Sequence, residues 1–280
     1  MIVLRTKQDL GDHLEKYRLE NQSIGFVPTM GALHPGHISL VRRASAENER
    51  TVVSIFVNPT QFNDPGDLEK YPRTLDEDLL ALQAVNTDVV FVPSVKEMYP
   101  EPDERTFDLG GLDRVMEGRQ RKGHFNGVAQ IVTRLFEAVP AHRAYFGQKD
   151  FQQLVIVRHL VRQLGLPLEI VACPIVREAD GLAMSSRNVR LDKKARDAAP
   201  FIYASLLEAR EQARNMAPDD LISWMEQRFK TRPEFTLEYF EIVDDKFLRA
   251  IGDWKEPVNK VACIAVQLNG IRLIDNLFFD

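Results

Sequence analysis

Short apolar runs alternate with amphipathic segments along the first 175 residues, and this alternation constrains the fold more than any other feature. Residues 51–57 (TVVSIFV) are almost all β-branched or aromatic, as in a strand buried on both faces. Further strands are predicted at 24–27, 88–92, 144–146 and 168–172, and helices at 7–20, 37–47, 74–84, 127–139 and 151–164. Strands that alternate with helices predict a parallel sheet with crossover helices.

The pattern changes near residue 176. Two long helices are predicted at 192–215 and 218–230, and strands follow at 236–243, 261–268 and 271–274. Helices followed by strands are typical of an α+β unit. We therefore predict an α/β protein with a Rossmann-like doubly wound parallel sheet over residues 1–175 and a smaller α+β carboxyl-terminal domain over residues 176–280.

Composition excludes several classes of protein. The chain has 280 residues, 44% apolar and 28% charged, as in soluble globular proteins. Its net charge of −5 disfavours a nucleic-acid partner, which needs a concentrated basic surface, but permits a small anionic substrate. Cys173 and Cys263 are far apart in the sequence and lie among apolar residues, so we expect buried free thiols and no disulfide. No apolar run approaches the ~20 residues of a membrane span, and the amino terminus lacks a signal-peptide pattern, so we expect a cytoplasmic protein without a membrane partner.

Residues 28–37 (PTMGALHPGH) are the first candidate phosphate-binding segment. A strand that turns on glycines into a helix presents backbone N–H groups and the positive end of a helix dipole. His34 and His37 add imidazole donors at the same place. The alternative interpretation is a pair of histidines at an ordinary strand-to-helix turn, because short motifs often match by chance.

Two later segments could bind phosphate as well. Residues 181–188 (GLAMSSRN) offer two hydroxyls and a guanidinium near the predicted domain boundary. In residues 146–153 (FGQKDFQQ), Lys149 stands at a helix start just after a short strand. The alternatives are a Ser/Asn-rich helix cap for the first segment and a solvated Lys149–Asp150 pair for the second.

Neutral amides could bind the hydroxyls or carboxylate of a substrate. Asn58 and Gln61 begin a predicted loop at 58–73, which follows the strand at 51–57, and Gln153 lies one helical turn after Lys149. An Asn-Pro turn would also explain Asn58, and Gln153 could be a surface amide. Two charged runs are predicted to be less specific: residues 119–124 form a flexible basic loop that could close over anions, and residues 74–78 start a helix with a capping box.

Five segments in the same order resemble one family, the pantothenate synthetases (pantoate–β-alanine ligases). They are PTMGALHPGH, SIFVNPTQF, YPRTLDEDL, FGQKDFQQL and VREADGLAMSSRN, and the likeness continues to residues 273–276 (LIDN). The wider superfamily contains nucleotidyltransferases and class I aminoacyl-tRNA synthetases. Residues 34–37 are similar to its His-x-Gly-His signature, and residues 184–187 stand where its members carry a Lys-Met-Ser-Lys-Ser segment.

The resemblance implies a two-step reaction. The carboxylate of pantoate attacks the α-phosphate of ATP and releases pyrophosphate, and the amine of β-alanine then attacks the pantoyl adenylate and releases AMP. It also implies Mg²⁺ bound with ATP through phosphate oxygens and water, a homodimer, and a carboxyl-terminal domain that acts as a lid. We assign no protein ligand to the metal.

The resemblance further implies roles for individual residues. His37, His34 and Lys149 are expected to be catalytic, with Lys149 on the α-phosphate. The expected ATP-binding residues are Met30, Gly31, Ala32, Leu33, His34, Pro35, Gly36, His37, Gly147, Gln148, Lys149, Asp150, Val176, Met184, Ser185, Ser186 and Arg187. Gln61, Gln153 and Asn58 are expected to bind the acid. Two departures stand out: Gln148 replaces a glutamate common in the family, and Ala183 and Ser186 replace the lysines of the superfamily segment.

Three other functions would use a similar phosphate site. A tRNA-charging enzyme would need a basic RNA-binding surface, which this acidic chain does not suggest. A nucleotidyltransferase with a phosphorylated acceptor would release pyrophosphate without an amine. A non-catalytic nucleotide sensor would show no turnover with any acid and amine.

Overall fold

The computed structural model describes residues 1–63 and 65–279, so Asp64 of the predicted loop at 58–73 lies outside the described residues. The chain forms two compact units. The first contains residues 1–148 and 156–174, and the second contains residues 149–155 and the chain from residue 175. The predicted domain boundary at residue 176 stays a prediction, because compactness alone does not establish independent folding.

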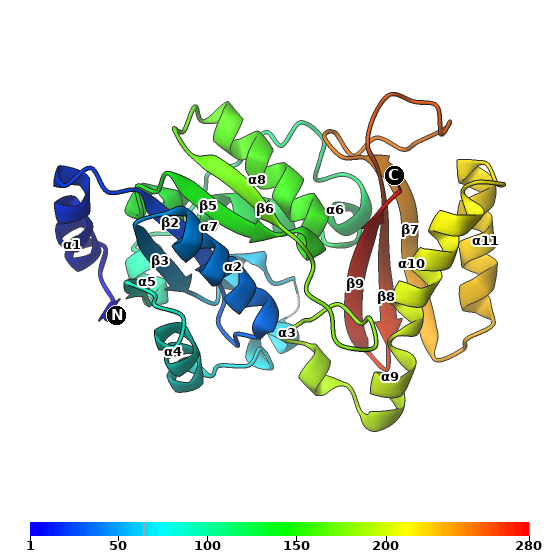
Figure 1. The fold of residues 1–280 in the computed structure, drawn as a ribbon, viewed down its shortest axis with the longest axis horizontal. Helices are drawn as coiled ribbons and strands as arrows, with labels where there is room; N and C mark the ends of the chain where they lie inside the picture. Colours follow the sequence, from blue (N-terminus) through cyan, green and yellow to red (C-terminus); the bar gives the residue numbers. More distant parts are fainter. Residues whose placement is uncertain (64, 280) are drawn as a thin grey trace. The chain divides into compact units, whose positions relative to one another are not determined.

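A parallel six-stranded sheet forms the centre of the first unit (Figure 1). Its strands are β1 (Ile2–Leu4), β2 (Ile24–Thr29), β3 (Arg50–Ile55), β4 (Val89–Phe91), β5 (Arg143–Gly147) and β6 (Glu169–Cys173), in the order β1-β4-β3-β2-β5-β6. β2 pairs with β3 on one side and with β5 on the other, so the order reverses there. In open α/β sheets, ligands bind beyond the carboxyl ends of the strands at such a reversal.

Helices cover both faces of this sheet, which confirms the predicted doubly wound α/β fold. The helices of this unit are α1 (Lys7–Leu19), α2 (Pro35–Glu47), α3 (Pro65–Glu69), α4 (Leu75–Gln83), α5 (Val95–Met98), α6 (Met116–Gln120), α7 (His124–Ala138) and the later part of α8 (Phe151–Gln163). Successive residues of a strand point to opposite faces. Val27 accordingly packs in the apolar cluster with Val41 of α2, whereas the ring of Phe26 contacts Phe136 of α7.

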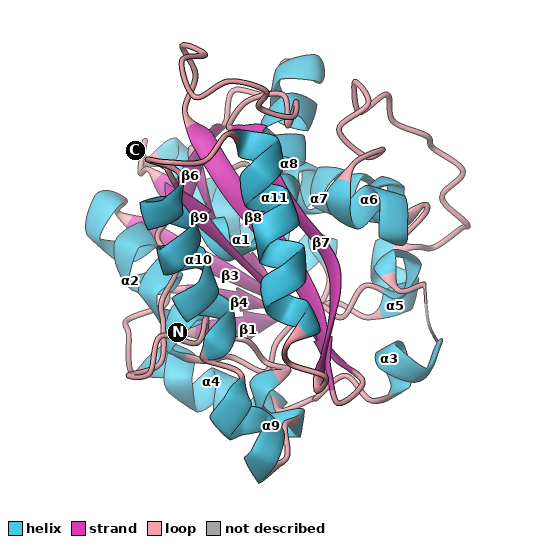
Figure 2. Cartoon of the chain, turned by 90° about the vertical axis from the view of Figure 1, so that its right-hand side faces the viewer, coloured by secondary structure: helices cyan, strands magenta, loops and turns pink. Residues whose placement is uncertain are grey.

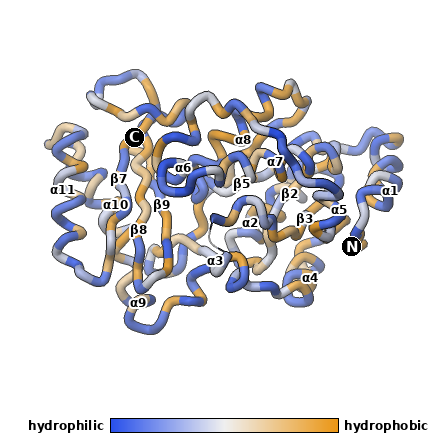
Figure 3. The backbone as a smooth tube through the Cα atoms, turned by 180° about the vertical axis from the view of Figure 1, so that it is seen from behind, coloured by the Kyte–Doolittle hydropathy of each residue, from blue (hydrophilic) through white to orange (hydrophobic). Residues whose placement is uncertain are grey.

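The second unit has an antiparallel sheet with helices on one face (Figure 2). The strands β7 (Phe235–Asp244), β8 (Lys260–Leu268) and β9 (Ile271–Phe278) pair in chain order. α10 (Phe201–Gln212) and α11 (Pro218–Lys230) bury Leu206 and Met225 against the strands. The central strand β8 is largely apolar (Figure 3). The predicted α+β unit is therefore confirmed.

Several predicted element boundaries were wrong. The helix predicted at 192–215 is two helices, α9 (Lys193–Ala198) and α10, because Pro200 has no N–H to continue the hydrogen-bond ladder. The predicted loop at 58–73 contains a 3₁₀ turn, η1 (Pro59–Gln61), as well as α3. The predicted capping box fails, since the Thr74 side chain makes no cap bond and its hydroxyl instead donates to Asp78 Oδ1 at 3.2 Å.

Two further points bear on the composition of the chain. Both cysteines are buried and unbridged, as expected from the sequence. Within the part of the chain that the structure describes, no helix combines the length and the apolar character needed to cross a bilayer.

Asp103 links the segment before α6 to helix α7. Its side chain is only 2% exposed and pairs with Arg105 at 2.8 Å and with Arg134 of α7 at 2.7 Å. Gln130 of α7 donates to the carbonyl oxygens of Asp103 and Arg105. Hydrogen bonds from Arg105 and then from Arg134 hold the pKa of Asp103 well below its usual range.

We expect Asp103→Asn to lower the free energy of unfolding in a pH-dependent way. An unfolded Asp titrates near pH ~3.9, so the stabilisation from the ionised Asp103 is complete above about pH 5 and is lost as pH falls toward the lower native pKa. Urea unfolding at pH 7, 5 and 3.5 should show that the free energy of unfolding of the variant lies below that of the native protein, and that this difference becomes smaller in acid. Asp12→Asn, at an exposed position, is the control. A difference in free energy of unfolding that has the same size at every pH would contradict the expectation.

Candidate active site

The turn after β2 is held by a carboxylate from α4. Gly31 and Ala32 both adopt positive φ, +79° and +49°, a conformation that costs energy for alanine. Asp78 offsets this cost: its Oδ2 accepts the N–H of Ala32 at 2.9 Å and its Oδ1 accepts the N–H of Leu33 at 2.8 Å. Asp78 is buried. A side chain at Gly31 would meet its carboxylate at 3.0 Å, so glycine is needed there.

His34 and His37 cap the helix that follows the turn. Helix α2 starts at Pro35, with His34 as its N-cap. The N–H of Gly36 donates to His34 Nδ1 at 3.2 Å, and the N–H of His34 donates to His37 Nδ1 at 3.3 Å. The ring centroids are 4.0 Å apart. A nitrogen that accepts an N–H carries no proton, so these bonds assign the proton of each neutral ring to Nε2.

These contacts correct one expectation about the motif. The sequence suggested that backbone N–H groups at this turn would be available to a phosphate. The N–H groups of Ala32, Leu33, His34 and Gly36 instead donate to Asp78 and to the two imidazoles. These four backbone N–H groups are therefore already used within the protein.

The predicted acid-binding amides Asn58 and Gln61 lie together at η1. Asn58 is 1% exposed, and its Nδ2 donates to Gln61 Oε1 and to the carbonyl oxygen of Gly127, both at 3.1 Å. Gln61 Nε2 lies 3.0 Å from Met30 Sδ, which brings the turn after β2 and the loop after β3 together. A thioether is a weak acceptor, so an oxygen of a ligand could replace it.

The basic run at 119–124 is not the flexible loop that the sequence predicted. Residues up to Gln120 belong to α6, and His124 begins α7. His124 Nδ1 lies 2.7 Å from the carbonyl oxygen of Gln61, and Arg121 donates to the same oxygen at 3.3 Å. These two basic residues fix the backbone of Gln61.

Lys149 follows β5 directly and belongs to the second unit. It lies in the 3₁₀ turn η2 (Gln148–Asp150), and its ammonium is 3.6 Å from the carboxylate of Asp150. The carbonyl oxygen of Lys149 accepts a hydrogen bond from Asn276 Nδ2 of β9 at 3.0 Å. The backbone that carries the ammonium is thus tied to the carboxyl-terminal strand.

The segment with the serines and Arg187 is tied to the same strand. Arg177 donates to both carboxylate oxygens of Asp275, at 2.6 and 2.9 Å, and to the carbonyl oxygen of Gly181 at 3.1 Å. Its guanidinium stacks 3.6 Å from the ring centroid of Tyr203. Burial raises the pKa of Asp275, and hydrogen bonds from Arg177 act in the opposite direction. Arg177 forms an isolated β-bridge with Ala183, just before the serines.

Local bonds shape the loop itself. The N–H of Met184 donates to the carbonyl oxygen of Val176 at 3.0 Å, which brings these two predicted ATP-binding residues together. The N–H of Arg187 donates to Ser185 Oγ at 3.2 Å. The short turn η3 (Asn188–Arg190) follows.

The predicted site residues therefore fall into two groups. The first unit holds residues 30–37, Asn58, Gln61, Gly147 and Gln148, and the second holds Lys149, Asp150, Gln153, Val176 and residues 184–187. Sequence reasoning missed Asp78, Arg177, Asp275 and Asn276 as groups that shape these segments. The sequence analysis had singled out segments that contain these residues. Asp78 lies in the charged run at 74–78, and Asp275 and Asn276 end the family-like residues 273–276.

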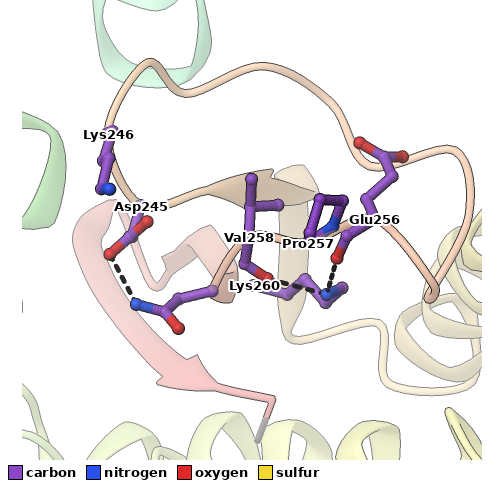
Figure 4. Close-up of a pocket in the computed structure, with 7 residues that line it drawn as sticks. Asp245, Lys246, Glu256, Pro257, Val258 and Lys260 are labelled. Carbon is purple, nitrogen blue, oxygen red and sulfur yellow. Dashed lines mark hydrogen bonds between the residues drawn. The ribbon is translucent and has the colours of Figure 1, made fainter.

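A polar pocket lies elsewhere in the second unit, at the loop between β7 and β8 (Figure 4). It is lined by Asp245, Lys246 and residues 256–260, and contains none of the predicted site residues. The Lys260 ammonium donates to the carbonyl oxygens of Glu256 and Val258 at 2.6 and 2.7 Å, so it stabilises the conformation of this loop. Over residues 1–63 and 65–279, no three His, Cys, Asp or Glu side chains form a metal-binding cluster.

The fold and these segments define a doubly wound α/β protein whose first unit carries candidate site residues in the turn after β2, where the strand order reverses. The family model for pantoate-beta-alanine ligase matches residues 2–278, so the chain belongs to that family. It is 53% identical over 277 residues to the pantothenate synthetase of Bacteroides fragilis, covering 99% of this chain and 98% of that protein. It is 50% identical to the one from Porphyromonas gingivalis over the full length of both.

Solved structures give the same result. Pantothenate synthetase from Thermus thermophilus superimposes with a TM-score of 0.92 at 43% identity, covering 99% of each chain. The pantoate-beta-alanine ligase from Francisella tularensis, complexed with beta-gamma ATP and beta-alanine, matches with a TM-score of 0.81 at 32% identity, covering 100% of this chain and 98% of that one. The resemblance found in the sequence is confirmed.

We expect Asp78→Asn to loosen the turn after β2. One of the two N–H groups would then face an amide NH₂ in place of an oxygen, and an unsatisfied buried donor costs about 1–3 kcal/mol. Turnover should fall at least tenfold and the free energy of unfolding should decrease. Asp76→Asn, two residues earlier and exposed, is the matched control. Equal behaviour of the two variants in urea unfolding and in turnover would contradict this role of Asp78.

Proposed function

We propose that this chain, as a pantoate–β-alanine ligase, condenses pantoate with β-alanine through a pantoyl adenylate. The observation that carries the proposal is the family match over residues 2–278 together with all five family-like segments. A carboxylate does not react with an amine until its oxygen becomes a good leaving group, and adenylation achieves this. Both steps develop negative charge on phosphate, so positioning and electrostatic stabilisation are the main tasks of the protein.

In the first step, a carboxylate oxygen of pantoate attacks the α-phosphorus of ATP. The bond to the bridging oxygen breaks and pyrophosphate leaves. His34 and His37 donate through Nε2 to phosphate oxygens, which agrees with the engagement of each Nδ1 by the backbone. Lys149 stabilises the charge that develops on the α-phosphate.

Ser185, Ser186 and Arg187 bind the β- and γ-phosphates and then the departing pyrophosphate. An arginine can bind two phosphate oxygens at once, which suits this role. Met30 to Gly36, Gly147, Gln148, Asp150, Val176 and Met184 line the nucleotide site. The neutral Gln148 adds no negative charge beside Lys149.

In the second step, the amine of β-alanine attacks the acyl carbon of the adenylate. The bond between that carbon and the phosphate oxygen breaks, AMP leaves, and the nitrogen loses a proton. Gln61 and Gln153 bind pantoate, and Gln61 also lies near the β-alanine site. Asn58 supports this site through its bond to Gln61.

Mg²⁺ accompanies ATP in this proposal. The candidate residues offer imidazoles, hydroxyls, an ammonium and a guanidinium, which suit phosphate better than a magnesium ion. The metal is therefore held by phosphate oxygens and water, where it neutralises part of the triphosphate charge. The proposal also includes a cytoplasmic homodimer whose carboxyl-terminal part closes as a lid and protects the adenylate from water.

The decisive assay is AMP release from ATP and pantoate, with and without β-alanine. We expect sustained AMP release only when both pantoate and β-alanine are present. Pantoate-dependent exchange of labelled pyrophosphate into ATP should occur without β-alanine, because the first step is reversible. A nucleotidyltransferase would release pyrophosphate without an amine, a tRNA-charging enzyme would need tRNA, and a nucleotide sensor would give no turnover. Any of those patterns would refute the proposal.

We expect Lys149→Ala and His37→Ala to lower kcat by about 10²–10³-fold each, because one electrostatic contact in a transition state is often worth ~2.7–4 kcal/mol. Lys149→Ala should unfold at nearly the native urea concentration, whereas His37→Ala should fold but lose about 0.5–2 kcal/mol of stability, because it removes the acceptor of the His34 N–H. Lys96→Ala, at an exposed position on α5, is the control for Lys149→Ala. Near-native turnover in either variant would remove the role assigned to that residue.

A further inference from the structure

A partly buried hydrogen-bond network centred on buried Asn58 adjoins Gln61 in the first unit. It starts at Tyr99, just after α5, whose hydroxyl donates to Asn58 Oδ1 at 2.8 Å. Asn58 Nδ2 then donates to Gln61 Oε1 at 3.1 Å. Thr60 joins from the side, with its hydroxyl 3.2 Å from Asn58 Oδ1 and 3.3 Å from the Tyr99 hydroxyl.

The carbonyl oxygen of Gly127 fixes the orientation of the Asn58 amide. A carbonyl oxygen can only accept, so the Asn58 atom that faces it at 3.1 Å must be the NH₂ group. A side chain at Gly127 would clash with the carbonyl of Thr60, so α7 and η1 are in direct backbone contact and cannot rearrange easily. Asn58 Oδ1 is consequently turned toward Tyr99.

The orientation of Asn58 then fixes that of Gln61. The NH₂ group of Asn58 also faces Gln61, so Gln61 must present its oxygen to Asn58. Its own NH₂ group is left facing Met30 Sδ at 3.0 Å. The carbonyl oxygen of Gln61 is held by His124 and Arg121, so backbone and side chain are fixed by different partners.

We propose that Tyr99 is a positioning residue that, through Asn58, makes Gln61 present a hydrogen-bond donor to the oxygen atoms of the acid substrate. The proposal rests on the role of Gln61 in pantoate binding given above. It gives Asn58, whose amide is used by protein partners, a supporting role beside Gln61 in place of direct contact with the acid.

The surroundings of Tyr99 support this assignment. The guanidinium of Arg134 lies 5.0 Å from the Tyr99 ring centroid, and Phe56 packs 6.3 Å away, so the ring stays in place without its hydroxyl. Arg134 in turn pairs with Asp103. Burial raises the pKa of Tyr99, so its hydroxyl remains protonated and can donate to Asn58.

The test is Tyr99→Phe, which removes the hydroxyl and leaves the packed ring. We expect KM for pantoate to rise about three- to tenfold, the range that corresponds to the net value of one neutral hydrogen bond, with KM for ATP and kcat nearly unchanged. Thr60→Val, at an exposed residue, should raise KM for pantoate by a smaller factor. Tyr17→Phe is the matched control, since Tyr17 is buried in the same unit and its hydroxyl lies 3.1 Å from His13 Nε2.

Gln61→Ala separates failure of this inference from failure of the proposed site. If Gln61→Ala raises KM for pantoate and Tyr99→Phe does not, only the positioning role of Tyr99 is refuted. If Gln61→Ala leaves KM for pantoate unchanged, the role of Gln61 in pantoate binding is refuted, and the inference about Tyr99 is refuted with it. If Tyr99→Phe and Tyr17→Phe change the kinetics alike, or KM for ATP rises with that for pantoate, the effect is general destabilisation and the inference is wrong. Should Tyr99→Phe fail to fold, Thr60→Val decides by the same criteria.

Discussion

The bond between Asp78 and the backbone after β2 is the constraint on which the candidate site depends most. Without it, two successive residues with positive φ would be held only by the strand before them and the helix after them. A left-handed alanine costs roughly 1–2 kcal/mol, which two charge-assisted bonds can offset. The turn sets where α2 begins, and the start of α2 sets the places of His34 and His37.

The second unit uses a buried carboxylate in a comparable way. Asp275 holds Arg177, which donates to the carbonyl oxygen of Gly181, just before the segment of predicted ATP-binding residues 184–187. Its neighbour Asn276 holds the backbone of Lys149. The ion pair between Arg177 and Asp275 thereby fixes the shape of this segment. Removing one partner of a buried ion pair usually costs about 3–5 kcal/mol, so loss of either side chain would destabilise the second unit. In both units, a carboxylate or an amide from a distant element shapes a segment that contains predicted site residues.

The sequence predicted the parts of the fold and site that are local. The strand at 51–57 and the helix at 218–230 each have a clear period, and the five motifs are contiguous. The sequence placed Asp78 only in a charged run at a helix start, because its partners, Ala32 and Leu33, lie 46 and 45 residues earlier and leave no periodic pattern. The bond from Tyr99 to Asn58 spans 41 positions and was invisible for the same reason. The break at Pro200 was visible, but the apolar period on both sides of it favoured one helix.

The double imidazole cap of α2 ties the protonation of the two histidines to the order of the helix end. A ring that took up a second proton would carry hydrogen on Nδ1 and could no longer accept the N–H of Gly36 or of His34. It would have to swing away, and the first turn of the helix would lose its cap. In acid, fraying of this helix end and gain of positive charge beside it would therefore be a single event.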